Sequence, residues 1–248
     1  MKAVILAGGL GSRLSEETGL KPKPMVEVGT KPIILHIMET YAAHGVTDFV
    51  ICAGYKANVI KDYFINFGAH ISDVEVNLKQ NSVKYLTCND LDWTIKIIDT
   101  GADTLTGGRL KRIKKYVEND AFFHMTYGDG VADIDITALT QFHKDHEKLA
   151  TVTTVAPVGR FGAIKVTGGN NIVSDFSEKP AGDGALINGG YFVLKPAALD
   201  FIDGDTSIWE REPMERLVAK GELVARHHTG FWHPMDTLRD KNHLNALI

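Results

Sequence analysis

Residues 2–14 read KAVILAGGLGSRL, a short apolar run followed by three glycines and an arginine. The run Lys2–Ala7 has the length and the β-rich content of a buried strand. In an open α/β sheet, ligands lie beyond the carboxyl ends of the strands, and the turn after the first strand is a frequent place for phosphate. Glycine lets the backbone approach a phosphate closely, and an arginine adds a bidentate charge. Residues 2–14 therefore predict a first strand that ends in an anion-binding loop.

A tight turn is the competing interpretation of the same glycines. The loop is not a P-loop, because no Gly-Lys-Ser/Thr follows. It is not a dinucleotide fingerprint either, because Leu14 stands where the third glycine belongs. Taken alone, the glycines leave the turn and the phosphate loop equally open, and the rest of the sequence decides between them.

Outward from the opening, strand-like runs alternate with helical patterns. Predicted strands are Lys2–Ala7, Asp48–Cys52, Val74–Leu78, Thr94–Asp99, Ala121–Tyr127 and Thr151–Ala156. Predicted helices are Ile33–His44, Ala57–Phe67, Leu105–Glu118 and Ile134–Glu147. This alternation is typical of βαβ units and indicates an α/β fold with a parallel or mixed sheet covered by helices.

After Pro157 the pattern changes from alternating strands and helices to short strand-like pieces separated by glycines. Residues 159–166, 170–176 and 185–194 are glycine-punctuated pieces that resemble short antiparallel strands. This predicts a smaller second lobe. No linker and no internal repeat separates the two lobes, so we expect one domain over residues 1–248 whose parts, 1–156 and 157–248, share one continuous sheet.

Composition narrows the class of protein. The chain has 248 residues, 44% of them hydrophobic, and a formal net charge of −4, so it can bury a core and has no basic field for nucleic acid or an anionic membrane. Its two cysteines, Cys52 and Cys88, have neither metal-ligand spacing nor the density of a secreted scaffold, and we expect buried free thiols in a reducing cytoplasm. No apolar run is long enough for a signal peptide or a membrane span.

A lysine–proline stretch, LKPKPMVEVGTKPI, follows the glycine loop at residues 20–33. Each proline holds the preceding residue extended, so the lysines before Pro22, Pro24 and Pro32 are stiffened. A stiff ammonium near a phosphate loop loses little freedom on binding and can stabilise charge that develops at phosphorus. A solvated connector with ordinary surface lysines is the simpler interpretation for any single Lys-Pro pair.

Two further stretches carry candidate ligands. Asp129 ends the apolar run AFFHMTY (121–127), where a strand would deliver a carboxylate to the ligand edge of the sheet, although an Asp-Gly turn is the simpler interpretation. HPMDT (233–237) contains another carboxylate, that of Asp236. His227, His228 and His233 raise a zinc alternative, which we discount because neighbours on a strand face opposite ways and no suitable ligand set adjoins them.

The ordered set AVILAGGLGSRL, KPKPMVEVGTKPI, TYGDGVAD, SEKP and PMDT resembles the sugar-1-phosphate nucleotidyltransferases. The similarity runs over essentially the whole chain and includes DTG, TGGRLKR, GRFGAI, INGGYFVL and GFWHPMDTLRD. The resemblance implies a Rossmann-like, three-layer αβα fold with a mixed, mainly parallel sheet and a smaller antiparallel sugar-binding lobe. It also implies Mg²⁺ as cofactor, with a nucleoside triphosphate and a hexose 1-phosphate as substrates. On this basis residues 1–156 bind the nucleotide, and residues 157–248 comprise the sugar-phosphate-binding part and the C-terminal segment.

The resemblance assigns roles residue by residue. Arg13 lies against the pyrophosphate part of the nucleotide, and Lys23, rather than Lys21, is the lysine that contacts phosphate during catalysis. Asp129 and Asp236 bind the metal, and Lys179 holds the phosphate of the sugar 1-phosphate; Arg13, Lys23, Asp129 and Lys179 form the catalytic set. The nucleotide set is Leu6, Ala7, Gly8, Gly9, Gly11, Ser12, Arg13, Lys23, Thr106, Arg109 and Gly128. The sugar-phosphate set is Gly162, Glu178, Lys179, Asn188 and Gly189.

The basic run TGGRLKRIKKYV (106–117) invites an RNA-binding hypothesis. With a net charge of −4 and no interleaved aromatic platform, a solvated helix face with a nucleotide-binding N-terminus is the better interpretation. We therefore predict neither nucleic-acid nor membrane partners, and the resemblance implies a cytoplasmic homo-oligomer.

The predicted reaction is the transfer of a cytidylyl group from CTP to α-D-glucose 1-phosphate, because the cytidylyl-transferring members of the family are the most similar. Transfer of a thymidylyl or uridylyl group to the same sugar phosphate stays open, since sequence spacing does not identify a base. A nucleotide-binding regulatory protein that has lost catalysis is a third hypothesis. Such a protein should lack part of the charge set, yet Arg13, Lys23, Asp129, Lys179 and Asp236 are all present.

Overall fold

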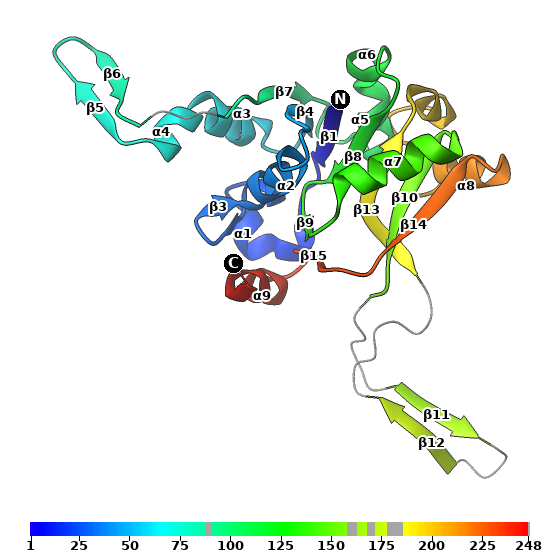
Figure 1. The fold of residues 1–248 in the computed structure, drawn as a ribbon. Coiled ribbons are helices and arrows are strands. Elements are labelled where there is room, and N and C mark those ends of the chain that lie inside the picture. The colour runs from blue at the N-terminus through cyan, green and yellow to red at the C-terminus, as the bar shows by residue number, and fades with distance from the viewer. Residues whose placement is uncertain (88–90, 158–162, 168–171, 178–185, 248) are drawn as a thin grey trace.

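The computed structural model describes residues 1–87, 91–157, 163–167, 172–177 and 186–247, the two short segments 163–167 and 172–177 by their backbone. Seven strands form one sheet in the order β14-β10-β13-β8-β1-β4-β7 (Figure 1). They are β1 (Lys2–Ala7), β4 (Asp48–Ala53), β7 (Thr94–Asp99), β8 (Phe123–Tyr127), β10 (Ala150–Val155), β13 (Ile187–Leu194) and β14 (Leu223–His228).

The sheet is mixed and mainly parallel, as predicted. β1 pairs in parallel with β4 on one side and β8 on the other, and the pairs β4–β7 and β10–β14 are also parallel. β13 runs antiparallel to both of its neighbours, β8 and β10. Because β13 and β14 come from the second part of the chain, the prediction that the two parts share one sheet is confirmed.

Helices cover both faces of the sheet, because the central strands are apolar on both sides. In β1, Ala3, Ile5 and Ala7 belong to one buried cluster, which includes residues of α2 (Ile33–Ala42), α3 (Ala57–Ile65), α7 (Ile136–His146) and α9 (Leu238–Leu247). Val4 and Leu6 belong to the opposite cluster, with α5 (Thr106–Arg112), α6 (Lys114–Val117) and α8 (Glu212–Ala219). A continuous apolar strand between two helical layers is the expected pattern for this architecture. The three-layer αβα prediction is confirmed.

Two predicted helices are interrupted. The pattern over Ala57–Phe67 forms α3, ends at Asn66 with non-helical backbone and restarts as α4 (Phe67–Ile71). The pattern over Leu105–Glu118 is divided at Ile113 into α5 and α6. Hydrophobic periodicity continues through both breaks, so the pattern alone did not reveal them.

Two hairpins lie outside the main sheet and extend away from it in Figure 1. The predicted strand Val74–Leu78 is β5 (Val74–Asn77), which pairs with β6 (Ser82–Tyr85) and is exposed at every position instead of joining the sheet. β11 (Ala163–Thr167) pairs with β12 (Ile172–Ser177), the antiparallel pairing expected for the second part of the chain.

The remaining elements are short, and most of them lie near the carboxyl end of β1. A 3-10 turn at Ser12–Leu14 leads into α1 (Ser15–Thr18), and a second 3-10 turn spans Lys23–Met25. β2 (Glu27–Val28) and β3 (Lys31–Pro32) form a small hairpin before α2, and β9 (Gly130–Ala132) pairs with β15 (Trp232–Pro234). A 3-10 helix over Pro196–Phe201 packs instead with α5, α6 and α8. None of the helices that the structure describes is long and apolar enough to span a bilayer.

Candidate active site

The glycine loop begins where β1 ends, at the carboxyl edge of the sheet. Gly11 has a φ of +65°, which an L-residue rarely adopts, and its carbonyl accepts a hydrogen bond from Leu14 N at 2.9 Å. Gly9 has open space around the position of a Cβ, whereas a Cβ on Gly8 would lie 2.0 Å from Arg109 Nη1. The two neighbouring glycines therefore serve different needs: Gly8 admits a protein side chain, and Gly9 leaves space that is free of protein atoms.

Arg109 fills the space beside Gly8. Its side chain is buried, and its guanidinium donates to the carbonyl oxygens of Gly8 at 2.9 Å, Gly101 at 2.8 Å and Ala53 at 3.3 Å. It also donates to Thr100 Oγ1 at 2.7 Å. Burial lowers the pKa of Arg109, which nevertheless stays a cation because its ordinary pKa is so high. Arg109 thus ties together the loops that follow β1, β4 and β7, and a direct nucleotide contact from it stays a prediction.

Lys23 reaches the same edge from the lysine–proline stretch. Pro22 is extended, with a ψ of 153°, and the 3-10 turn that follows places the Lys23 side chain in a buried position. Lys21, two residues earlier, points elsewhere and pairs with Glu27 Oε1 at 3.3 Å. The structure therefore separates the two lysines that the sequence places side by side.

Two carboxylates meet the Lys23 ammonium. Nζ lies 2.6 Å from Asp129 Oδ2 and 2.8 Å from Asp236 Oδ1. Asp129 follows β8, which lies beside β1, and Asp236 follows β15. The antiparallel pair β9–β15, with Gly130 opposite Pro234, brings the two aspartates together across 107 positions of sequence, and Met235 N donates to the Asp129 carbonyl at 2.8 Å.

Arg13 completes a group of four charges. Its Nη1 donates to Asp236 Oδ2 at 2.9 Å, and 73% of its side chain is exposed. A long, exposed cation on the rim of a buried pair keeps much of its freedom, so a ligand anion can recruit it at little cost. Four of the five charges that were predicted as one set are thus connected by ion pairs: Arg13, Lys23, Asp129 and Asp236. The fifth, Lys179, lies outside the described residues.

The carboxylate pair fits a hard divalent cation. The ammonium of Lys23 already occupies a position between two carboxylate oxygens, which shows that the site accepts a cation there. Mg²⁺ prefers one or two carboxylates with phosphate oxygens and water over a cage made only of protein. Within the described part of the chain, no three His, Cys, Asp or Glu side chains converge on one point, so the pair would depend on substrate oxygens to complete the coordination.

Gly128 lies between β1 and the lysine turn. Its N–H donates to the Leu6 carbonyl at 2.9 Å, and a Cβ at this position would lie 2.9 Å from Pro24 Cγ and 3.0 Å from Leu6 O. A side chain here would push the turn that carries Lys23 away from β1. Leu6 and Ala7 form the end of β1 beside it and are buried.

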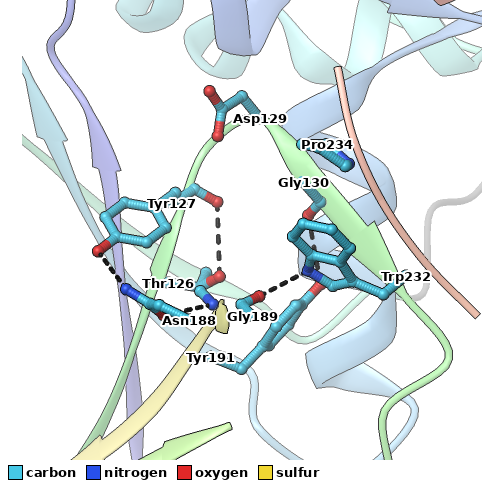
Figure 2. A pocket seen from close by; sticks show the side chains of 10 residues that line it. Thr126, Tyr127, Asp129, Gly130, Asn188, Gly189, Tyr191, Trp232 and Pro234 are labelled. Atoms are coloured by element: carbon cyan, nitrogen blue, oxygen red, sulfur yellow. Dashed lines mark hydrogen bonds between the residues drawn. The ribbon is translucent and has the colours of Figure 1, made fainter. Parts of the chain in front are cut away.

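A small cavity opens next to Asp129, and its walls include both Asn188 and Gly189 (Figure 2). Figure 2 shows the Asn188 side chain directed toward Tyr127, with Trp232 and Tyr191 on the opposite side of the cavity. The Trp232 Nε1–H donates to the Gly189 carbonyl at 2.7 Å. Asn188 and Gly189, the residues of β13 predicted to bind the sugar phosphate, therefore adjoin Asp129, the carboxylate predicted to bind metal.

Tyr127 and Glu210 are the polar residues at this site that the sequence analysis did not single out. Tyr127 Oη donates to Glu210 Oε1, and Thr106 Oγ1 donates to Glu210 Oε2 at 2.7 Å. Burial, reinforced by the negative charge of Glu210, raises the pKa of Tyr127 far above its ordinary value, so the phenol keeps its proton. Glu210 belongs to no motif and lies 83 residues from Tyr127, so no sequence pattern connected them.

Gly162, Glu178 and Lys179 lie outside the residues that the structure describes. Their predicted roles toward the sugar and its phosphate stay predictions. Ser12 is exposed in the 3-10 turn beside Arg13, as expected for a residue of the glycine loop.

The histidines near the C-terminus contact the backbone. His227 Nδ1 lies 3.2 Å from Thr154 O, His228 Nε2 lies 3.1 Å from Phe231 O, and His233 Nδ1 lies 2.8 Å from Pro234 O. His228 also lies 3.0 Å from a carboxylate oxygen of Asp133. Each of the three rings thus has a hydrogen-bond partner in the backbone.

The basic residues of α5 and α6 do not form a uniformly solvated face. Lys111 donates to the carbonyl oxygens of Ile202 and Asp203, Arg112 forms a bidentate pair with Asp205, and Lys114 pairs with Asp200. The predicted solvated face is present at Lys111, Arg112 and Lys115, which are exposed, and acidic residues in the segment 200–205 balance part of its charge. Arg109 departs from the prediction because it is buried. Cys52 is a buried free thiol, as predicted, and burial raises its pKa to about 12; Cys88 lies outside the described residues.

Comparison of the sequence with known proteins gives full-length relatives. The family model described as nucleotidyl transferase matches residues 2–232. The glucose-1-phosphate cytidylyltransferase of Salmonella typhimurium is 56% identical over 247 residues, which cover 100% of this chain and 95% of that protein. The probable glucose-1-phosphate cytidylyltransferase of Bacillus subtilis is 40% identical over 249 residues, covering 100% of this chain and 96% of that protein.

Solved structures share the fold at lower identity. HddC from Yersinia pseudotuberculosis, complexed with GMP-PN, superposes with a TM-score of 0.71 at 23% identity and covers 99% of this chain and 98% of its own. A UDP-glucose pyrophosphorylase complexed with UDP-glucose gives a TM-score of 0.70 at 15% identity, covering 99% of this chain and 97% of its own. These superpositions are evidence for the architecture.

Proposed function

Because this chain belongs to the nucleotidyl transferase family, we propose that it transfers a cytidylyl group from CTP to α-D-glucose 1-phosphate, giving CDP-glucose and pyrophosphate. The observation that carries the proposal is the convergence of Lys23 with Asp129 and Asp236 beside the glycine loop. The two full-length relatives, both named for this activity, support the choice of CTP and glucose 1-phosphate.

The chemistry requires two anions to approach each other. A phosphate oxygen of the sugar 1-phosphate attacks the α-phosphorus of CTP in line, and pyrophosphate leaves from the opposite side, so the enzyme forms no covalent intermediate. The attacking group is already ionised, and catalysis therefore rests on positioning and on cationic charge. Lys23 supplies a fixed ammonium at the carboxyl edge of the sheet, and Arg13 is placed to hold the part that leaves as pyrophosphate.

Asp129 and Asp236 are the residues that would hold Mg²⁺, which, when bound, would neutralise phosphate charge and orient the reacting oxygens. Both carboxylates also contact Lys23, so the lysine shares its partners with the cation. The Lys23 ammonium has three N–H donors, and the two aspartates use two of them. The third can donate to a phosphate oxygen of the substrate. The arrangement supports a role for Lys23 that depends on charge and position rather than on proton transfer.

The sugar phosphate is assigned to the cavity beside Asp129. Asn188 has both donor and acceptor atoms for hydroxyl groups. Gly189 lines the same cavity, but a Cβ there would lie 3.0 Å from Val155 Cγ1 and 3.1 Å from Thr153 O, so this glycine serves the close packing of β13 on β10. We assign Glu178 to the sugar hydroxyls and Lys179 to the sugar phosphate, with Gly162 shaping the pocket. The nucleotide is assigned to the glycine loop and to the N-terminal end of α5, which includes Thr106.

Pyrophosphate release tests the proposal. The protein is supplied with glucose 1-phosphate, Mg²⁺ and, in separate reactions, CTP, UTP, dTTP, ATP or GTP. We expect strong preference for CTP. Preference for dTTP or UTP would retain the mechanism and replace the product, because cytosine has an N4 donor where uracil and thymine have an O4 acceptor. No release with any nucleotide, for this or other hexose 1-phosphates, would contradict the enzyme and favour a nucleotide-binding regulatory protein.

A further inference from the structure

A chain of hydrogen bonds links the two halves of the candidate site. Asn188 Nδ2 donates to Tyr127 Oη at 3.3 Å, Tyr127 Oη donates to Glu210 Oε1, and Thr106 Oγ1 donates to Glu210 Oε2 at 2.7 Å. Trp209 N in turn donates to Thr106 Oγ1 at 2.9 Å. Glu210 therefore receives one hydrogen bond from the residue assigned to the nucleotide and, through Tyr127, fixes the residue assigned to the sugar.

We propose that Glu210 is a positioning residue, which orients Asn188 through Tyr127 on the sugar side and Thr106 on the nucleotide side. The inference rests on the proposed function, because it uses the assignment of Asn188 to the sugar 1-phosphate and of Thr106 to the nucleotide. Glu210 itself is exposed and lies outside the walls of the cavity beside Asp129.

The chemical reason is that a carboxylate only accepts hydrogen bonds. Glu210 therefore makes Tyr127 point its O–H toward the carboxylate, which leaves the lone pairs of Tyr127 Oη to accept from Asn188. An amide can rotate by a half turn and exchange its oxygen with its nitrogen, and only one of these orientations places the NH₂ group on such an acceptor. The negative charge of Glu210 thus decides which group donates and which accepts in each hydrogen bond from Glu210 through Tyr127 to Asn188.

The backbone around Asn188 agrees with this orientation. Asn188 Oδ1 accepts from Gly190 N at 2.8 Å, so each end of the amide has a partner of the correct kind. Gly190 has a φ of +82°, and a Cβ there would lie 2.8 Å from Tyr127 Cδ2, so the glycine lets the Tyr127 ring lie against β13. Asn188 keeps one N–H and one lone pair unused by these bonds, a donor and an acceptor that suit a sugar hydroxyl.

A double-mutant cycle tests whether Glu210 acts through Tyr127. The variants are E210A, Y127F and the double variant, with E212A as a matched control two residues along the chain and equally exposed. We expect E210A and Y127F each to raise the KM for glucose 1-phosphate about tenfold, the factor that one charge-assisted hydrogen bond typically carries, with kcat changed much less. In the double variant the KM for glucose 1-phosphate should equal that of either single variant.

The KM for CTP is a second measurement, and a variant that is merely destabilised would not show the pattern expected for it. E210A should raise the KM for CTP through Thr106 and should do so equally in the Y127F background, because Y127F leaves the Thr106–Glu210 bond in place. E210Q should recover part of the loss in E210A, since it keeps one acceptor oxygen and replaces the other, which accepts from the second donor, with an NH₂ group. Melting temperatures identify any variant whose fold is damaged.

Two results would overturn the inference. One is a KM for glucose 1-phosphate in E210A that matches the E212A control. The other is a double variant whose penalties multiply, because independent residues add their free energies. The wild-type rate with CTP is measured first and tests the proposed function separately. If another nucleotide supports turnover, the same cycle is run with that nucleotide, and in the absence of turnover it is run on glucose 1-phosphate affinity by calorimetry.

Discussion

Lys23 is the residue on which the account of the site depends most. Its ammonium lies within hydrogen-bond distance of two carboxylates that come from different strands, and its side chain is almost completely buried. An isolated buried ammonium is costly, so Lys23 would not be stable there without Asp129 and Asp236. Lys23, Asp129 and Asp236 therefore depend on one another electrostatically, and a change in one alters the environment of the other two.

Replacing Lys23 should separate it from Lys21. We expect K23A to lower kcat by at least about a hundredfold, because an electrostatic contact to the reacting phosphate is worth several kcal/mol in a site of this kind. K21A, a matched change two residues earlier, should stay within about threefold of wild type, since the Lys21–Glu27 pair is a partly exposed ion pair of small energy. Steady-state kinetics of pyrophosphate release measures both. Equal losses in the two variants would contradict the assignment.

Gly8 and Gly9 offer a second comparison at the scale of single residues. G8A places a methyl group 2.0 Å from Arg109 Nη1, and because that guanidinium is held by several backbone acceptors, we expect a loss of about 2–4 kcal/mol of stability. The methyl group of G9A meets no atom of the described residues within 4 Å, so this variant should keep the wild-type melting temperature and weaken CTP binding, because we place the phosphates against this loop. Thermal unfolding with and without CTP distinguishes the two. A G8A variant with the wild-type melting temperature would contradict the role of Arg109 in holding together the loops that follow β1, β4 and β7.

The sequence identified single residues well where a motif contained both charge and backbone restraint. It placed Arg13, Lys23, Asp129 and Asp236 in one set, and the structure brings them into contact. It did not reveal that Arg109 is buried, because helical periodicity assigns a face and does not describe a cavity between three loops. Glu210 was missed for a related reason: its partners come from residues 106 and 127, and hydrogen bonds of this range leave no local pattern.

At the scale of elements, α7 is attached to the sheet through a group of buried histidines. His124 on β8 lies 3.1 Å from Thr140 Oγ1 on α7, and His143 and His146 on α7 both contact Thr151 Oγ1 on β10, at 2.8 Å and 2.7 Å. His124 Nδ1 is buried and has no hydrogen-bond partner among the described residues. Burial, with a smaller contribution from neighbouring charge, lowers the pKa of His124 to about 3 and that of His143 to about 4.

These histidines should make the fold sensitive to acid. The unfolded chain binds a proton at each histidine near pH 6.5 while the folded protein does not, so stability is complete above about pH 6.5 and falls as the pH decreases toward the folded pKa values. For His124 the loss reaches about 2 kcal/mol at about pH 5. H124F keeps an aromatic ring in place and should show a shallower decline. Urea unfolding at neutral and acidic pH measures both proteins, and an unchanged slope in H124F would contradict the argument.

The elements themselves were predicted with unequal success. Six strands of the main sheet and α2 fall within a few residues of their predicted bounds, because each has a strong apolar pattern that the fold buries. The seventh strand, β14, was not predicted, and it is only partly buried. Val74–Leu78 also has a strand pattern, yet β5 is exposed along its length, since alternation predicts a strand without saying which sheet it joins. The break at Ile113 lies inside an apolar pattern formed by Leu110, Ile113 and Val117, which are all buried in one cluster, so no local pattern records it.

At the scale of the whole molecule, the order of the strands explains the location of the site. β1 and β8 lie side by side and deliver the glycine loop and Asp129 to one edge, and β13, the antiparallel strand beside β8, brings Asn188 to the same edge from the second part of the chain. The βα alternation predicted the parallel half of this arrangement. The glycine-punctuated pieces after Pro157 predicted antiparallel strands in the same sheet, but no local pattern predicted that β13 would lie between β8 and β10.

We propose that Asp129 and Asp236, at the carboxyl edge of the sheet, act in catalysis and not in nucleotide binding alone. The most direct test is the rate of CDP-glucose formation from CTP and glucose 1-phosphate by wild type and D129N, with CTP affinity measured on the same preparations. We predict that D129N retains CTP binding and that its rate falls by about three orders of magnitude, as expected for loss of a group that acts on the transition state. Full activity in D129N would contradict the metal and lysine site described for Asp129, Asp236 and Lys23.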